Sequence, residues 1–357
     1  MKQGASQKEK PFCVHEVISI HILISSCNRY VRGMEMDRVR RMIGCDSREV
    51  RPYTGRGVYV GVLDSGVAAH PDLRGRIAAF KDFTSRDYAA RSFASRRMYY
   101  DDNGHGTHVC GVLGGNGAVS RGKYRGIAPE CTLICGKVLD KKGGGSLKNL
   151  ISGLFWITEM AKSYPIRVLN ISIEMESEEN IDRDDWEQFK KQIQYLWNNN
   201  IIIVAAAGNK GPNPMTLSPI GECGGCVCVG CHDGDYQGSG GRLCNEYSSR
   251  GPGKDLTIMN MINRNPLKKP DIVAPGTDIV SCNSRYITSP YIAKSGTSMS
   301  APIVSGACAL CLQKYPYMTN RELRRLLLGS AIDLGQSWSV QGAGMLRIDK
   351  LLAQTVV

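Results

Sequence analysis

The sequence predicts an α/β fold in which a mostly parallel, doubly wound sheet carries helices on both faces. Several short, nearly continuous apolar runs are typical of strands that are buried on both sides. Segments with apolar residues at helical spacing lie between these runs, and this alternation favours a parallel sheet. In such sheets the chemistry lies at the carboxyl ends of the strands.

The expected elements alternate in order along the chain. The strands are the apolar runs at residues 58–63, 133–139, 168–173 and 201–207. The helices are one that begins near Val109 and those at residues 153–164, 186–199 and 298–315. In residues 186–199, for example, Trp186, Phe189 and Ile193 recur at the spacing that places them on one helix face.

The composition is that of a globular protein with a sizeable core. The chain has 357 residues, of which 42% are hydrophobic and 22% are charged, so it is not intrinsically disordered. Its length suits one large domain or two ordinary ones. A membrane-spanning helix is not expected, because the chain has no uninterrupted apolar run of about 18 residues.

The charge is strongly basic but dispersed. Lys and Arg number 45 against 33 Asp and Glu, which gives a formal net charge of +12. A nucleic-acid site requires basic residues gathered on one surface, and the sequence has no compact Lys/Arg block with interleaved aromatic residues. We therefore expect a solvated basic surface and no nucleic-acid partner.

The 14 cysteines bear on the compartment. Disulfide-stapled secreted domains are usually short and loop-rich, whereas this chain is long and its cysteines lie within apolar runs. Free cysteine packs as a small hydrophobic residue. The pattern predicts buried free thiols and a reducing, cytoplasmic location.

The first residues leave an alternative open. An apolar stretch at residues 17–24 follows basic residues and precedes Cys27, which resembles a weak bacterial lipoprotein signal. Glu9, Glu16 and His21 argue against such a signal, because they interrupt it with polar or charged groups. Export, or lipid anchoring through Cys27, is the alternative to a cytoplasmic location.

Three short stretches carry residue types suited to catalysis. Asp64 ends the first expected strand, and His105 lies between two glycines that let other backbone approach it closely. Ser298 is expected at a helix N-terminus, where free N–H groups favour developing negative charge. Taken singly, each has an ordinary interpretation: a strand-end acid, a core histidine and a helix N-cap.

Taken together, the three stretches resemble the subtilase family. The order Asp, His, Ser is that of subtilisin, and the local sequences D-S-G, H-G-T-H and G-T-S-M-S-A-P resemble the family's motifs. Further blocks at residues 205–209, 247–252 and 269–276 resemble it in the same order. The loop at residues 115–129 is most similar to bacterial intracellular-type subtilases.

The resemblance implies a subtilisin-like three-layer fold with a catalytic domain at residues 51–357. Residues 1–50 would then be an N-terminal extension, either a short pro-segment or the product of a mis-assigned start. The family's folded inhibitory propeptide is not recognisable in them.

The resemblance also implies a serine endopeptidase that needs no cofactor for catalysis. Ser298 would be the nucleophile, His105 the general base and Asp64 the residue that orients it. Asn209 would donate to the oxyanion. The alternative is a catalytically altered subtilase that acts as a protein-binding or signalling module. A nucleotide-binding protein is disfavoured, because no G-x-G-x-x-G opens the first helix.

A peptide or protein substrate would bind as an added β-strand. The resemblance places the substrate-binding segments at Gly143, Gly144 and Gly145, at Ser172, Ile173 and Glu174, and at Ala206, Ala207 and Gly208.

Glu174 departs from the family pattern, which usually has glycine at this position. The carboxylate would narrow the pocket that binds the residue before the scissile bond, and its charge would favour Arg or Lys in that pocket. The other interpretation is a solvated acidic loop, to which Glu176, Glu178, Glu179, Asp182, Asp184 and Asp185 also belong.

Two groups of residues bear on metal binding. The spacing of Cys223, Cys226, Cys228 and Cys231 resembles a four-thiolate site. Valines alternate with these cysteines as in a core strand, and residues on opposite strand faces cannot all bind one ion, so core packing is favoured. Asp72 matches a calcium ligand of the family, but the usual binding loop is not recognisable, so structural calcium stays open.

Overall fold

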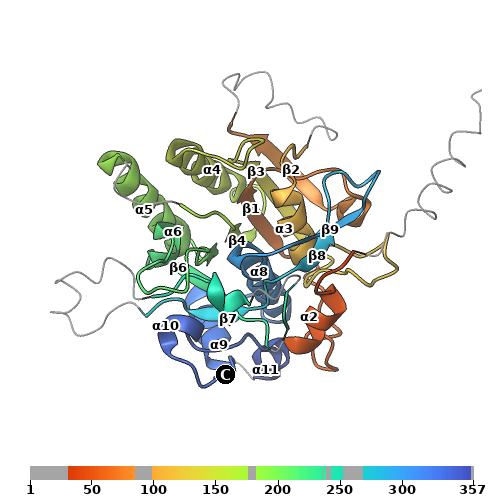
Figure 1. Ribbon diagram of the computed structural model, residues 1–357. Helices are drawn as coiled ribbons and strands as arrows, with labels where there is room; N and C mark the ends of the chain where they lie inside the picture. The colour runs from red at the N-terminus through yellow and green to blue at the C-terminus, as the bar shows by residue number, and fades with distance from the viewer. Residues whose placement is uncertain are drawn as a thin grey trace, which may run out of the picture.

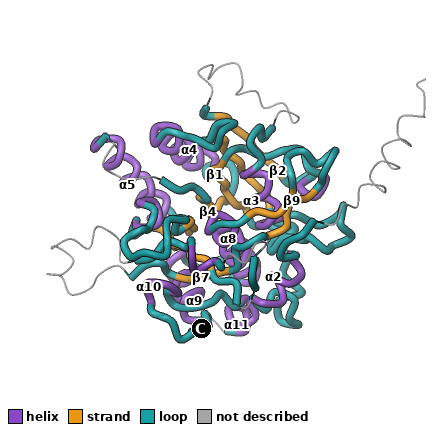
Figure 2. The backbone as a smooth tube through the Cα atoms, viewed as in Figure 1, coloured by secondary structure: helices purple, strands orange, loops and turns teal. Residues whose placement is uncertain are grey.

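The computed structural model describes residues 31–84, 99–175, 182–234, 236–238, 243–251 and 268–354. These residues form one parallel sheet with helices packed on both of its faces (Figures 1 and 2). The predicted α/β fold class is confirmed.

The sheet has seven parallel strands in the order β2-β3-β1-β4-β5-β6-β7. The strands are β1 (Tyr59–Asp64), β2 (Ile77–Asp82), β3 (Thr132–Lys137), β4 (Ile166–Ile171), β5 (Ile202–Ala206), β6 (Cys226–Cys231) and β7 (Ile272–Ala274). The four apolar runs correspond to β1, β3, β4 and β5. Outside this sheet, β8 (Ile279–Cys282) and β9 (Tyr291–Lys294) form an antiparallel pair.

Each face of the sheet has its own hydrophobic core. In β5, Ile202 and Val204 pack into the core shared with α3 (His105–Gly114) and α8 (Thr297–Lys314). Ile203 and Ala205 point the other way, into the core shared with α4 (Leu147–Met160) and α5 (Arg183–Asn198). This period-two alternation between two apolar layers explains why the strands are continuously hydrophobic in sequence.

Helix α4 begins six residues before the predicted start. Ser146 precedes the helix, and its hydroxyl accepts a hydrogen bond from the Asn149 backbone N–H. Leu150 and Leu154 bury the same apolar face on either side of Gly153. The predicted start at Gly153 is therefore wrong, because the Ser146 cap and the apolar spacing extend the helix toward the N-terminus.

Residues 31–50 pack against the larger of the two hydrophobic cores. They contain α2 (Met36–Met42), in which Met36 and Val39 are fully buried, and Figure 1 shows α2 beside α11 (Ile348–Ala353). The Met34 N–H donates to the Asp278 carbonyl, and the Val280 N–H donates to the Met34 carbonyl. This segment thus contributes to the main core.

The remaining elements are short or lie near the carboxyl terminus. They are η1 (Pro71–Leu73), α6 (Pro219–Glu222), η2 (Cys244–Glu246), α9 (Asn320–Gly329) and α10 (Trp338–Gln341). Among the residues that the structure describes, no helix combines the length and the apolar character needed to cross a membrane.

Candidate active site

The carboxyl end of the sheet brings the three predicted catalytic residues to one region. Asp64 is the last residue of β1, His105 is the first residue of α3, and Ser298 is the second residue of α8. Gly106 lets α3 approach the turn after β1, because a Cβ there would lie 2.1 Å from the Gly66 carbonyl oxygen. The close backbone approach expected from the glycines beside His105 is therefore present.

Asp64 and His105 form a direct hydrogen bond. The distance from Nδ1 of His105 to Oδ1 of Asp64 is 2.7 Å, and Asp64 is 1% exposed. Because a carboxylate only accepts, Nδ1 carries the proton and Nε2 is left as the basic nitrogen. Burial opposes protonation of His105, but the adjacent carboxylate prevails and raises its pKa above the usual value.

The hydroxyl group of Ser298 is hydrogen-bonded to the backbone of another segment. It donates to the Ser172 carbonyl oxygen at 3.1 Å, and the contacts of the described residues include no hydrogen bond between Ser298 and His105. The Ser172 hydroxyl in turn donates to the Ser298 carbonyl at 3.0 Å. Ser172 and Ser298 are thus joined by two hydrogen bonds, each from the hydroxyl of one residue to the carbonyl of the other.

The side chain of Asn209 has a fixed orientation. Its Oδ1 accepts the backbone N–H of Thr297, the residue before the candidate nucleophile, at 2.9 Å. Its Nδ2 therefore faces the other way and donates to Oε2 of Glu174 at 3.0 Å. The donor predicted to bind an oxyanion already holds a carboxylate of the protein itself.

A cleft of about 670 Å³ lies beside this contact. Its lining includes all three predicted glycines, Gly143, Gly144 and Gly145, together with Ile173 and Glu174. The chain leaves β4 at Ile171, so the two cleft-lining residues at 173 and 174 lie beyond the strand end rather than inside it.

The third predicted substrate-binding segment is less accessible. Ala206 ends β5 and Ala207 follows it, and both are buried. Gly208 lies nearer to the cleft, since a Cβ there would be 3.3 Å from Oε1 of Glu174. Gly208 has a φ of +104°, a left-handed conformation that favours glycine. Glu174 therefore spans the space between its own segment and the Gly208–Asn209 turn.

Some of the predicted acidic loop also lines the cleft. Asp182 and Asp185 lie on its wall with Lys148, whose ammonium group is 3.7 Å from the Asp185 carboxylate. Asp182 also caps α5 by accepting the backbone N–H groups of Asp184 and Asp185. Glu176, Glu178 and Glu179 lie outside the described residues.

The cysteine block packs as core, as its alternation with valine indicated. Cys226, Cys228 and Cys231 lie in three different hydrophobic clusters, and the Cys223 thiol donates to the Pro219 carbonyl. Burial raises the pKa of the Cys228 thiol to about 12, which disfavours the thiolate form that binds metals. The structure describes twelve cysteines, and all twelve are free.

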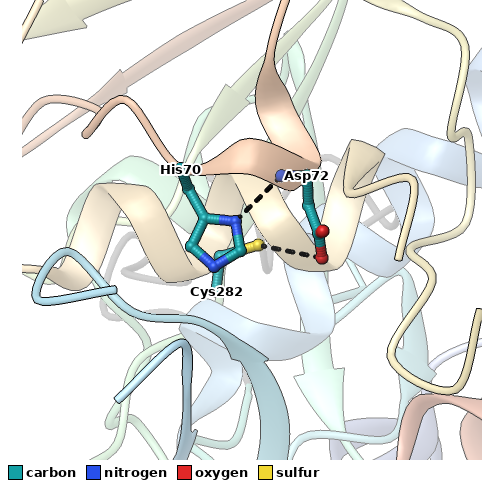
Figure 3. A group of neighbouring side chains, drawn as sticks. All are labelled: His70, Asp72 and Cys282. Carbon is teal, nitrogen blue, oxygen red and sulfur yellow. Dashed lines mark hydrogen bonds between the residues drawn. The ribbon is translucent and has the colours of Figure 1, made fainter. Parts of the chain in front are cut away.

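Asp72, the predicted calcium candidate, lies in a buried cluster with His70 and Cys282 (Figure 3). Its Oδ1 accepts the Val119 N–H at 2.9 Å, and its Oδ2 accepts the Tyr291 hydroxyl at 2.7 Å. Nδ1 of His70 accepts the Asp72 N–H, as the dashed line in Figure 3 shows.

This cluster does not fit a calcium ion. Calcium requires about six to eight oxygen ligands, whereas both Asp72 oxygens are held by protein donors and its neighbours offer nitrogen and sulfur. A softer metal fits no better. The His70 lone pair is already used, and burial together with the charge of Asp72 holds the pKa of the Cys282 thiol well above its usual value.

Removing the Tyr291 hydroxyl should destabilise the protein. Tyr291→Phe leaves the buried Asp72 carboxylate without its O–H donor, which should lower the free energy of unfolding by about 1–3 kcal/mol. Urea denaturation measures this loss, with Tyr286→Phe as the control because Tyr286 is less buried. A calcium-dependent rise in the parent's midpoint that Asp72→Asn abolishes would contradict the hydrogen-bonded interpretation.

Comparisons with known proteins show which sequences and folds this chain is similar to. The model of the "Subtilase family" matches residues 55–347. "Serine protease AprX" from Bacillus subtilis (strain 168) is 34% identical over 337 residues, which cover 87% of this chain and 71% of that protein. The "Intracellular serine protease" of Paenibacillus polymyxa is 33% identical over 82% of this chain and 79% of its own length.

A solved structure has the same fold. "Sphericase" superposes with a TM-score of 0.69 at 27% sequence identity, over 87% of this chain and 96% of that chain.

Proposed function

Because the chain belongs to the subtilase family and is a subtilisin-like serine endopeptidase, we propose that Asp64, His105 and Ser298 form its catalytic triad. The observation that carries this proposal is the 2.7 Å hydrogen bond between Asp64 and His105, the first residue of a helix that packs against the helix bearing Ser298. The bond leaves Nε2 of the imidazole free to act as the base.

The proposed reaction passes through an acyl-enzyme. Ser298 turns toward His105, loses its proton to Nε2 and attacks the scissile carbonyl carbon. The imidazolium is stabilised by the buried Asp64 carboxylate and then gives the proton to the departing amine. Water, activated by His105 in the same way, hydrolyses the ester and restores Ser298.

The negative charge of the tetrahedral intermediate needs donors. We assign this role to Nδ2 of Asn209 and to the backbone N–H of Ser298. The hydrogen bond from the Thr297 N–H to Oδ1 of Asn209 supports the assignment, since it couples the amide to the nucleophile's own turn. The protein needs no cofactor for this chemistry.

The peptide substrate is proposed to lie between two segments, as an added β-strand. One segment contains Gly143, Gly144 and Gly145 and the other contains Ser172, Ile173 and Glu174, and both contribute to the cleft. Gly143 has a φ of +83°, a left-handed conformation that favours glycine, so no side chain projects from the cleft wall at this position.

We further propose residues 51–357 as the catalytic domain, onto which residues 31–50 pack. A cytoplasmic location is proposed from the cysteine content and from the relative that is named as intracellular. Export or anchoring through Cys27 is the alternative, and Cys27 lies outside the described residues.

Labelling with a fluorophosphonate probe tests the function. The native protein should gain one probe mass on the peptide that contains Ser298, and heat-denatured protein should gain none, because reaction needs the assembled triad. A folded protein whose Ser298 does not react would contradict the proposal and favour a protein-binding role.

A further inference from the structure

The carboxylate of Glu174 bridges the two sides of the candidate active site. Its Oε2 accepts the hydrogen bond from Nδ2 of Asn209 at 3.0 Å. Its Oε1 lies 3.3 Å from the position of a Cβ on Gly208. A negatively charged oxygen of the protein is thus bound to the amide proposed to stabilise the negatively charged oxygen of the intermediate.

We infer that Glu174 holds the enzyme in a resting state that a cationic substrate side chain releases. The inference rests on the proposed roles of Ser298 and Asn209. In the resting state Glu174 occupies the Asn209 donor, so a substrate with a neutral side chain before the scissile bond must displace the carboxylate without compensation. A Lys or Arg side chain there pairs with Glu174, draws it off Asn209 and frees Nδ2 for the oxyanion.

The surroundings of Glu174 favour this exchange. The carboxylate forms no ion pair with any Lys or Arg among the described residues, and its one hydrogen-bond partner there is the neutral amide of Asn209. Two further carboxylates, of Asp182 and Asp185, line the same cleft against one lysine, Lys148. The cleft is therefore locally acidic on a chain with a net charge of +12, which concentrates cations at this site.

The resting orientation of Ser298 agrees with this inference. Its hydroxyl donates to the carbonyl of Ser172, two residues before Glu174 in the same segment. A substrate strand that binds along residues 172–174 contacts the Ser172 carbonyl, which holds the Ser298 hydroxyl in the resting state. It also contacts the Glu174 carboxylate, which occupies the Asn209 amide. Selectivity for a cationic side chain therefore appears in the rate of acylation as well as in binding.

Two variants separate the two proposed actions of Glu174, which are to occupy the Asn209 amide and to pair with a cationic substrate side chain. Peptide substrates that differ only in Arg or norleucine before the scissile bond measure kcat/KM for the parent, Glu174→Ala and Glu174→Gln. The parent should prefer Arg by about tenfold or more, since a hydrogen bond to a charged group is strong enough to cause such a factor.

Glu174→Ala should raise kcat/KM for the norleucine peptide about tenfold and abolish the preference. Glu174→Gln should cleave both peptides slowly, because its amide oxygen still accepts from Asn209 but has no charge to pair with Arg. Glu187→Gln, which removes a carboxylate that pairs with Lys190 on α5 outside the cleft, is the matched control and should behave as the parent.

Fluorophosphonate labelling separates failure of this inference from failure of the proposed function. A neutral probe should label Ser298 about tenfold faster in Glu174→Ala than in the parent. Equal labelling rates, a parent without preference for Arg, or a Glu174→Gln variant as fast as Glu174→Ala would each overturn the inference while leaving the triad intact. No labelling of Ser298 in any variant would overturn the triad itself.

Discussion

Replacing Ser298 by alanine should abolish peptide hydrolysis and leave the fold intact. In subtilisin, the loss of the nucleophile lowers kcat by about 2 × 10⁶, and the same order is expected here because the acyl-enzyme is proposed to form on the Ser298 hydroxyl. The Ser298 hydroxyl makes one hydrogen bond in the resting structure, to the Ser172 carbonyl. Its loss should cost only about 0.5–1.5 kcal/mol of stability.

Two measurements establish this result together. The initial rate of cleavage of a chromogenic peptide gives kcat, and urea denaturation shows whether the variant is folded. A folded Ser298→Ala protein that cleaves peptides at near the parental rate would show that the nucleophile has been wrongly assigned.

Replacing Asp64 by asparagine should lower kcat by about 10⁴, the factor known for the equivalent change in serine proteases. The amide of asparagine can donate a hydrogen bond to Nδ1, which favours the imidazole tautomer whose Nε2 carries the proton and cannot act as a base. The shape of the site should change little, since the two side chains are nearly the same size.

The pH dependence of kcat/KM gives this prediction a second readout. His105 must be neutral to accept a proton, so the parent's activity should fall as the pH decreases through its pKa, which Asp64 raises above the usual value. In Asp64→Asn the raising charge is gone while the burial that lowers the pKa stays, so the acid limb should shift to lower pH. Asp82→Asn, which alters a buried strand-end carboxylate outside the triad, is the control. An unshifted acid limb in Asp64→Asn would contradict the assignment.

Much of the fold could be predicted from local pattern alone. The strands β1, β3, β4 and β5 are apolar on both faces, so continuous runs identify them. The helix α9 is absent from the predicted elements, although Thr319 and Glu322 form a capping box whose residue types are visible in the sequence. By contrast, the burial of α2 depends on its packing against β8, which lies more than 200 positions later in the chain. No local pattern reports such contacts.

Some features of the candidate site could likewise be predicted from the sequence, whereas others depend on the tertiary structure. The types and order of Asp64, His105 and Ser298 were readable because a few catalytic roles demand particular side chains. The contact between Glu174 and Asn209 was not, because it joins segments 35 residues apart whose spacing depends on how β4 and β5 pair. The sequence placed Glu174 on the wall of a pocket, and the structure adds its partner.

The alkylation rates of the buried thiols can measure local unfolding of this protein. Alkylating reagents react with thiolates, and burial raises the pKa of Cys131, Cys228 and Cys311 to about 12, so thiolate is scarce at neutral pH. Reagent reaches these sulfurs only when the surrounding elements separate. Cys223 is partly exposed, so it should react without such separation and serve as an internal reference. The modification rate of each thiol, divided by that of Cys223, therefore maps how often each layer of the molecule opens.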